Sequence, residues 1–190
     1  LSGFDAADHT GNIIDNDSLI TDDGTTEACQ ANIPTITVDE SSLVTDVSES
    51  FTGVFNGDDG TNAVDDYALG VSSSGADSSL VDTATGNKVF LFLESVVVVG
   101  REGTDTTDAF TGQIVLNINV DASGTVELDQ VRAIVHSDTA NPDDSSSSMT
   151  ANLITLAATV TYGDSSTANA VANIAGSFIF IDDIPVAAAD

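Results

Sequence analysis

The chain has 190 residues, of which 31 are acidic and only three are basic, so its formal net charge at pH 7 is −28. Binding to nucleic acid or to an anionic membrane surface needs clustered Lys and Arg, which this composition excludes. So many like charges destabilise a compact state unless cations neutralise or screen them. Asp supplies 25 of the acidic residues. Because short carboxylates on turns can join backbone carbonyls around a hard ion, this bias favours Ca²⁺.

Ser and Thr alternate with Val, Ile, Leu and Phe along most of the chain, which is typical of half-buried strands. The predicted strands are residues 33–38, 50–55, 67–73, 88–94, 96–101, 110–120, 151–162, 168–174 and 177–181. Turns rich in Gly, Asp, Asn and Ser separate them at residues 56–60, 85–87, 121–124 and 163–166. One helical turn is predicted at residues 127–135 from the spacing of Leu128, Val131 and Val135. Eight or nine strands with little helix predict an all-β fold, an antiparallel β-sandwich with calcium-binding loops.

Two regions differ in composition. Residues 1–32 are acidic and poor in apolar residues, and we predict a linker or a segment that wraps the sandwich and becomes ordered when an ion binds. Residues 33–190 form the predicted sandwich domain. No run of about 20 apolar residues is present, so insertion into a membrane is not expected.

The first candidate ion site is the loop at residues 136–144. It carries four oxygen-donating side chains, namely Asp138, Asn141, Asp143 and Asp144. Oxygen donors at alternate positions can converge on one Ca²⁺. The alternative is a solvated acidic turn.

The second candidate lies in the acidic segment and consists of Asp15, Asp17, Asp22 and Asp23. The first two have the alternate spacing of a calcium loop. The sixth-position Gly and the terminal Glu of an EF-hand are absent, so that motif is not present. The alternative is a linker without an ion.

The third candidate places Asp182 and Asp183, which follow the last predicted strand, against Asp39 and Glu40, which follow the first full strand. If tandem copies of the domain follow one another, these clusters lie near junctions. A cation there would stiffen the linkage. The alternative is two exposed strand ends.

Catalytic chemistry finds no support in the sequence. His9 and His136 are the only histidines and Cys29 is the only thiol, and neither a nucleophile elbow nor a zinc-protease motif is present. We therefore expect a protein that is not an enzyme. Arg101 and Arg132 are expected to bridge carboxylates, and the alternative, contact with an acidic ligand group, is assigned to Arg132.

Seven segments together resemble the repeat domain of giant RTX adhesins that Gram-negative bacteria export by type I secretion. They are PTITVDES (34–41), YALGV (67–71), LVDTATG (80–86), VGRE (99–102), VELDQVRAIVHSDTANPDD (126–144), LITLAATVT (153–161) and FIFIDDIP (178–185). Their order and spacing cover about four-fifths of the chain and omit the first 32 residues.

The resemblance implies a Ca²⁺-loaded β-sandwich that is extracellular, at the cell surface, and is monomeric when isolated. Its partners would be adjacent domains of the same adhesin and a peptide or protein C-terminus on a host or neighbouring cell, captured through a Ca²⁺-dependent pocket. It carries over Asp138, Asn141, Asp143 and Asp144 as site residues, and Asp39, Glu40, Asp182 and Asp183 as structural ligands.

Two other functions remain open. A purely structural extender would only lengthen the fibre and would hold closed ions at its ends and turns. A halophilic protein would use its carboxylates to organise hydrated salt generally.

Overall fold

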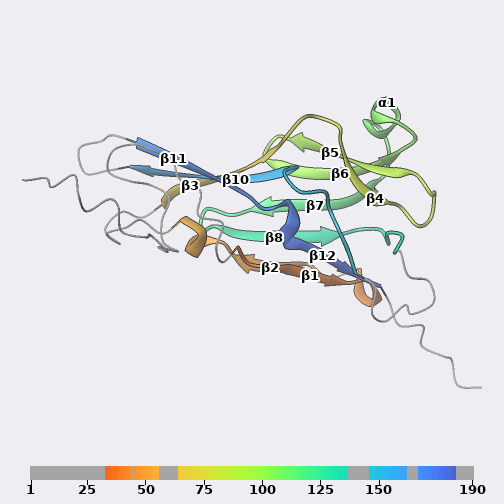
Figure 1. Cartoon of the computed structure of the whole chain (residues 1–190), viewed down its shortest axis with the longest axis horizontal. Helices are drawn as coiled ribbons and strands as arrows, with labels where there is room; N and C mark the ends of the chain where they lie inside the picture. Colours follow the sequence, from red (N-terminus) through yellow and green to blue (C-terminus); the bar gives the residue numbers. More distant parts are fainter. Residues whose placement is uncertain (1–32, 44, 56–63, 137–145, 162–166, 183–190) are drawn as a thin grey trace, which may run out of the picture.

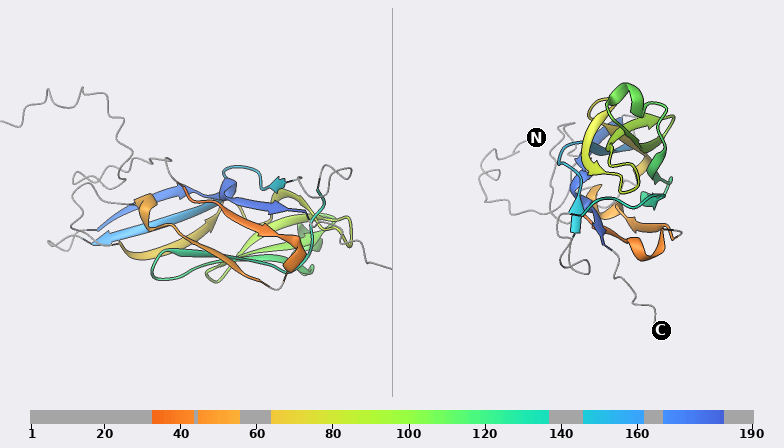
Figure 2. Two further views of the ribbon diagram at one scale, coloured as in Figure 1. Left: turned by 90° about the horizontal axis from the view of Figure 1, so that it is seen from below. Right: turned by 90° about the vertical axis from the view of Figure 1, so that its right-hand side faces the viewer.

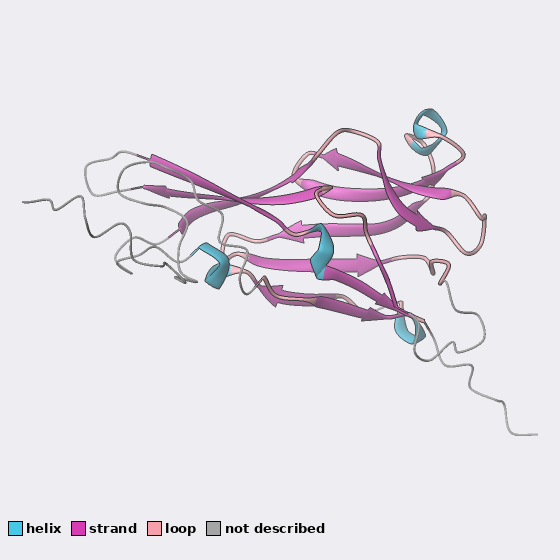
Figure 3. Ribbon diagram, viewed as in Figure 1, coloured by secondary structure: helices cyan, strands magenta, loops and turns pink. Residues whose placement is uncertain are grey.

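The computed structural model describes residues 33–43, 45–55, 64–136, 146–161 and 167–182, and this part of the chain has an all-β fold (Figure 1). Its strands are β1 (Ile36–Asp39), β2 (Val47–Ser50), β3 (Val64–Val71), β4 (Ala76–Val81), β5 (Lys88–Glu94), β6 (Val97–Gly103), β7 (Ile114–Val120), β8 (Thr125–Gln130), β9 (Ser146–Ser148), β10 (Ile154–Thr161), β11 (Thr167–Asn173) and β12 (Phe178–Ile181). The helical turns, drawn in cyan in Figure 3, are η2 (Glu40–Ser42), η3 (Thr52–Phe55), α1 (Thr106–Ala109) and η4 (Ala175–Ser177). No helix among the described residues is long and apolar enough to cross a bilayer.

The strands form two layers. One is a six-stranded antiparallel sheet in the order β2-β8-β7-β6-β5-β4, and two three-stranded sheets, β1-β12-β9 and β11-β10-β3, lie across it (Figure 2). The two small sheets are connected in the chain, because η4 leads from β11 directly to β12. The all-β sandwich predicted from the sequence is confirmed. One pair departs from the antiparallel pattern, since β1 and β12 are parallel.

The core fills the space between the layers with alternate residues of the strands. On β1, Ile36 and Val38 are buried, and on β12 the rings of Phe178 and Phe180 are fully buried. Each such side chain contributes about 1.5–3 kcal/mol relative to leaving it in water. The period-two pattern of the sequence thus holds β1 and β12 against the six-stranded sheet and fixes where both strands end.

Most predicted strand positions are confirmed, and β5 has the predicted range of residues 88–94. The helical turn predicted at residues 127–135 is wrong. Leu128 lies in strand β8 and faces the core, whereas Val131 and Val135 are 45% and 48% exposed, so their helical spacing is coincidental.

The strand predicted at residues 50–55 is also wrong, because β2 ends at Ser50 and the 3₁₀ turn η3 follows. β2, β4, β8 and β9 were not predicted as strands. Ser-rich sequences such as that of β9 carry no apolar alternation, so their strand conformation depends on pairing with a neighbour.

Candidate functional site

The parallel pairing of β1 with β12 brings two predicted ligands together. Asp39 is opposite Ile181 in this pair, so the next residues of both strands, Glu40 and Asp182, lie side by side at the same end of the sandwich. Glu40 and Asp182, two of the four residues of the third predicted site, therefore meet within one domain. The hypothesis that they hold a cation remains a prediction.

His136 completes this group. One potential ligand atom from each of Glu40, His136 and Asp182 lies within 4.8 Å of the others. The side chains of Glu40 and His136 are only 5% and 2% exposed, and His136 Nε2 lies 3.4 Å from Glu40 Oε1. We call these three residues the Glu40 centre.

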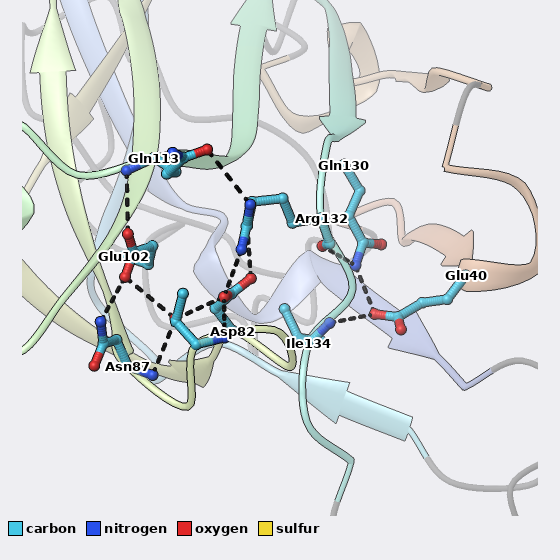
Figure 4. Close-up of polar contacts among 9 residues, drawn as sticks. Glu40, Asp82, Asn87, Glu102, Gln113, Gln130, Arg132 and Ile134 are labelled. Carbon is cyan, nitrogen blue, oxygen red and sulfur yellow. Dashed lines mark hydrogen bonds and ion pairs between the residues drawn. The ribbon is translucent and has the colours of Figure 1, made fainter.

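Glu40 is held firmly by the segment that follows β8 (Figure 4). Its Oε1 accepts a hydrogen bond of 2.6 Å from Gln130 Nε2 and one of 2.9 Å from the backbone N–H of Ile134. Gln130 Nε2 also donates to the carbonyl of Arg132 at 3.1 Å. The carboxylate is therefore fixed in position by neutral donors, with no guanidinium or ammonium group bonded to it among the described residues.

Asp39, the third described residue of the predicted set, has a different role. Its exposed carboxylate accepts a 2.9 Å hydrogen bond from the backbone N–H of Ser41 and caps the turn η2. Hydrogen bonding from the Ser41 side chain and backbone lowers the pKa of Asp39. Asp39 thus shapes the turn that presents Glu40.

A second buried carboxylate, Asp82, lies beside the same segment. Arg132 binds it in a bidentate manner, with Nε 2.8 Å from Oδ1 and Nη2 2.9 Å from Oδ2 (Figure 4). Thr85 donates to Oδ2 from its backbone N–H and its hydroxyl at 2.8 and 2.7 Å. These bonds, that from Arg132 foremost, lower the pKa of Asp82 to about 2. We call this pair the Asp82 centre.

Further polar residues continue from the Asp82 centre. Glu102 accepts bonds from Asn87 at 2.7 Å and from Thr85 at 3.2 Å, and Gln113 Oε1 lies 3.5 Å from Arg132 Nη1. The expectation that Arg132 bridges a carboxylate is confirmed, as is the same expectation for Arg101, which binds Glu94 at 2.7 Å. The proposed contact of Arg132 with a ligand stays a prediction.

The other predicted site residues lie outside the described residues. They are Asp15, Asp17, Asp22, Asp23, Asp138, Asn141, Asp143, Asp144 and Asp183. The flanks of residues 137–145 are described, and both lie beside the Glu40 centre: His136 belongs to it, and Ser146 pairs with Ile181, which precedes Asp182. The described flanks of the first predicted ion site thus lie beside Glu40 and Asp182, two residues of the third.

Sequence reasoning missed His136 as a member of this centre. The sequence offered one indication of this role, namely that His136 is the first residue of the acidic loop at residues 136–144. Gln130 was missed as well, because an amide at the end of a strand has no distinctive pattern.

The arrangement defines an all-β sandwich domain with an acidic, histidine-containing centre at the end of its parallel strand pair. The profile of the family described as a domain of unknown function (DUF5801) matches residues 35–175, and the chain belongs to this family. No curated protein and no solved structure matches the chain significantly.

Proposed function

We propose that the chain is a calcium-dependent adhesion domain of a large secreted bacterial RTX adhesin, without enzymatic activity. The observation that carries the proposal is the use of the basic residues. Each of the three, Lys88, Arg101 and Arg132, pairs with a carboxylate of its own: Asp77, Glu94 and Asp82 respectively.

With every basic side chain so engaged, the formal charge of −28 has no protein cation left to offset it. The Asp-rich segments supply hard oxygen donors, which are the ligands that Ca²⁺ prefers. Bound Ca²⁺ would neutralise these segments and favour the folded state by mass action. The resemblance to RTX adhesin repeats supports the same ion and an extracellular location at the cell surface.

The proposed activity is capture of a peptide or protein C-terminus from another cell. Asp138, Asn141, Asp143 and Asp144 would hold a Ca²⁺ ion with one position open for the carboxylate of the ligand. Without such an ion, a polyanionic domain would repel that carboxylate. The two flanks of this segment, His136 and Ser146, lie near the end of β12, and a site held between them would be formed at that end of the sandwich.

A screen of C-terminal peptides by isothermal titration tests this proposal, in millimolar Ca²⁺ and again in chelator. We expect binding only in Ca²⁺ and only to peptides with a free carboxylate, so amidated peptides serve as controls. The variant Asp143→Asn should weaken binding, whereas Asp66→Asn, on an exposed residue of β3, should not. If no peptide binds at millimolar concentration, ligand capture is wrong.

The second candidate is a structural extender of the adhesin fibre, and the parallel pairing of β1 with β12 favours it. Because the first and last described strands run in the same direction, the chain enters the sandwich at one end and leaves it at the other (Figure 1). Tandem domains need this arrangement to form an extended fibre. An extender would require Ca²⁺ for stability but would bind none of the peptides.

A further inference from the structure

We infer that Glu40, His136 and Asp182 form a binding site for a borderline divalent metal such as Zn²⁺, distinct in kind from the calcium sites proposed above. This inference goes beyond the adhesin function and does not depend on it. It rests on the imidazole of His136, a ligand that no prediction assigned to this end of the domain.

The first observation is an unsatisfied nitrogen. His136 Nε2 is buried and has no hydrogen-bond partner among the described residues, although it lies 3.4 Å from Glu40 Oε1. A direct N–H···O bond would bring these atoms to about 2.7–3.2 Å. Buried polar atoms are rarely left without a partner, so this nitrogen points to a missing one.

The second observation is the partner of the other ring nitrogen. His136 Nδ1 lies 3.4 Å from the hydroxyl oxygen of Ser147 on β9. With its proton on Nδ1, shared with Ser147, the ring would keep its lone pair on Nε2, the nitrogen that lies 3.4 Å from Glu40 Oε1. Metal-binding histidines are usually oriented in this way by an oxygen on their far side.

The third observation concerns charge. The side chain of Glu40 is buried, and the partly exposed Asp182 lies close to it, so two carboxylates meet at this point. The basic residues that could neutralise them are paired elsewhere. A divalent cation would offset both charges at once, and the rigid hydrogen bonds from Gln130 and Ile134 already hold Glu40 in place for it.

The donor set indicates the class of metal. Calcium takes oxygen ligands almost exclusively, whereas imidazole with carboxylates suits Zn²⁺ and its neighbours in the first transition row. Two carboxylates and one imidazole supply three ligands, and zinc sites with three protein ligands keep a fourth position for water or for a bound molecule.

The test is titration of the full chain with Zn²⁺ in millimolar Ca²⁺, so that calcium sites are filled throughout. All variants carry Cys29→Ser, which removes the only thiol. The sequence offers a matched control, because His9 and His136 are the only histidines. We expect one Zn²⁺ per chain, with affinity reduced at least ~10-fold by His136→Gln and by Asp182→Asn but unchanged by His9→Gln.

Proton NMR of the two histidine rings tests the site without any substitution in the Glu40 centre. Zn²⁺ should shift the His136 ring resonances and leave those of His9 in place. The inference is overturned if Zn²⁺ does not bind, if His136→Gln binds it as tightly as the parent chain, or if millimolar Ca²⁺ displaces it. Calcium dependence of the melting temperature could fail while Zn²⁺ binding persists, so the two proposals fail separately.

Discussion

The Asp82 and Glu40 centres handle a buried carboxylate in opposite ways. Asp82 is fully buried and receives a bidentate guanidinium from Arg132. Glu40, nearly as buried, receives only an amide, a backbone N–H and a nearby imidazole. A side chain of the protein, Arg132, neutralises Asp82. The Glu40 centre instead brings two carboxylates together at the ends of β1 and β12. From this difference we predict that the Glu40 centre, rather than the Asp82 centre, depends on an external cation.

The two centres are also connected through one short segment of the chain. Ile134 forms a β-bridge with Asp82, and its N–H donates to Glu40. Both carboxylates therefore lie beside the same short stretch of chain after β8. They differ in charge partner far more than in backbone surroundings.

The largest predicted effect is that of chelation. Moving the protein from millimolar Ca²⁺ into chelator should lower the melting temperature strongly, because each ion held at 100 times its dissociation constant contributes about 2.7 kcal/mol. For a chain of this size that corresponds to roughly 5–10 °C for each site. Circular dichroism measures the shift.

Hydrogen exchange with and without Zn²⁺, in millimolar Ca²⁺ throughout, sharpens the contrast. The N–H of Ile134, bonded to Glu40, should gain more protection on addition of Zn²⁺ than that of Thr85, bonded to Asp82. Equal changes would mean that the two centres do not differ in their need for a cation. If molar NaCl restored the melting temperature fully in chelator, the halophilic alternative would be favoured over specific calcium sites.

The next effect is that of Arg132→Gln. It leaves the carboxylate of Asp82 buried without a charge partner, which costs about 3–5 kcal/mol. Urea denaturation should show this loss equally in Ca²⁺ and in chelator, since the Asp82 centre needs no ion.

Lys88→Gln provides the matched control for that variant. Lys88 pairs with Asp77 at 2.6 Å, but their side chains are 59% and 37% exposed. Exposed pairs contribute about 0–1 kcal/mol, so the loss should be small. Comparable losses for both variants would refute the special role of the buried pair.

The smallest predicted effect concerns acid. The pKa of Asp82 is about 2 in the folded protein, below its ordinary value of 3.8. A depressed pKa stabilises the fold above pH 4, and this contribution disappears as the pH falls from about 4 to 2. It amounts to about 2 kcal/mol, because one pKa unit is about 1.4 kcal/mol.

Measuring the free energy of unfolding of the parent chain and of Asp82→Asn between pH 5 and pH 2 isolates this contribution from the other carboxylates. The difference between the two proteins should shrink toward low pH. A constant difference over this range would contradict the lowered pKa.

Local pattern was enough to predict the fold class but not the site. The alternation at residues 88–94 gave β5, because apolar side chains facing a core repeat every second residue. The same reasoning from local spacing gave a wrong helical turn at residues 127–135, where two of the three apolar residues at helical spacing are exposed. β8 pairs with β2 and β7, and its residues are buried at every second position, as in a strand.

The Glu40 centre could be predicted only in part. Glu40 and Asp182 were selected because acidic pairs follow strands, yet their meeting requires β1 to pair in parallel with a strand about 140 residues later. No local spacing encodes that pairing. The contribution of His136 depends on its burial, which comes from the second layer of the sandwich rather than from its neighbours in the chain.

The shared direction of β1 and β12 has a mechanical consequence. Tension applied between the start of β1 and the end of β12 runs along both strands and loads the hydrogen bonds between them in shear. Bonds loaded in shear must break together, whereas an antiparallel hairpin pulled from its open end unzips one bond at a time. In the adhesin fibre proposed above, this parallel pair would resist tension applied along the fibre.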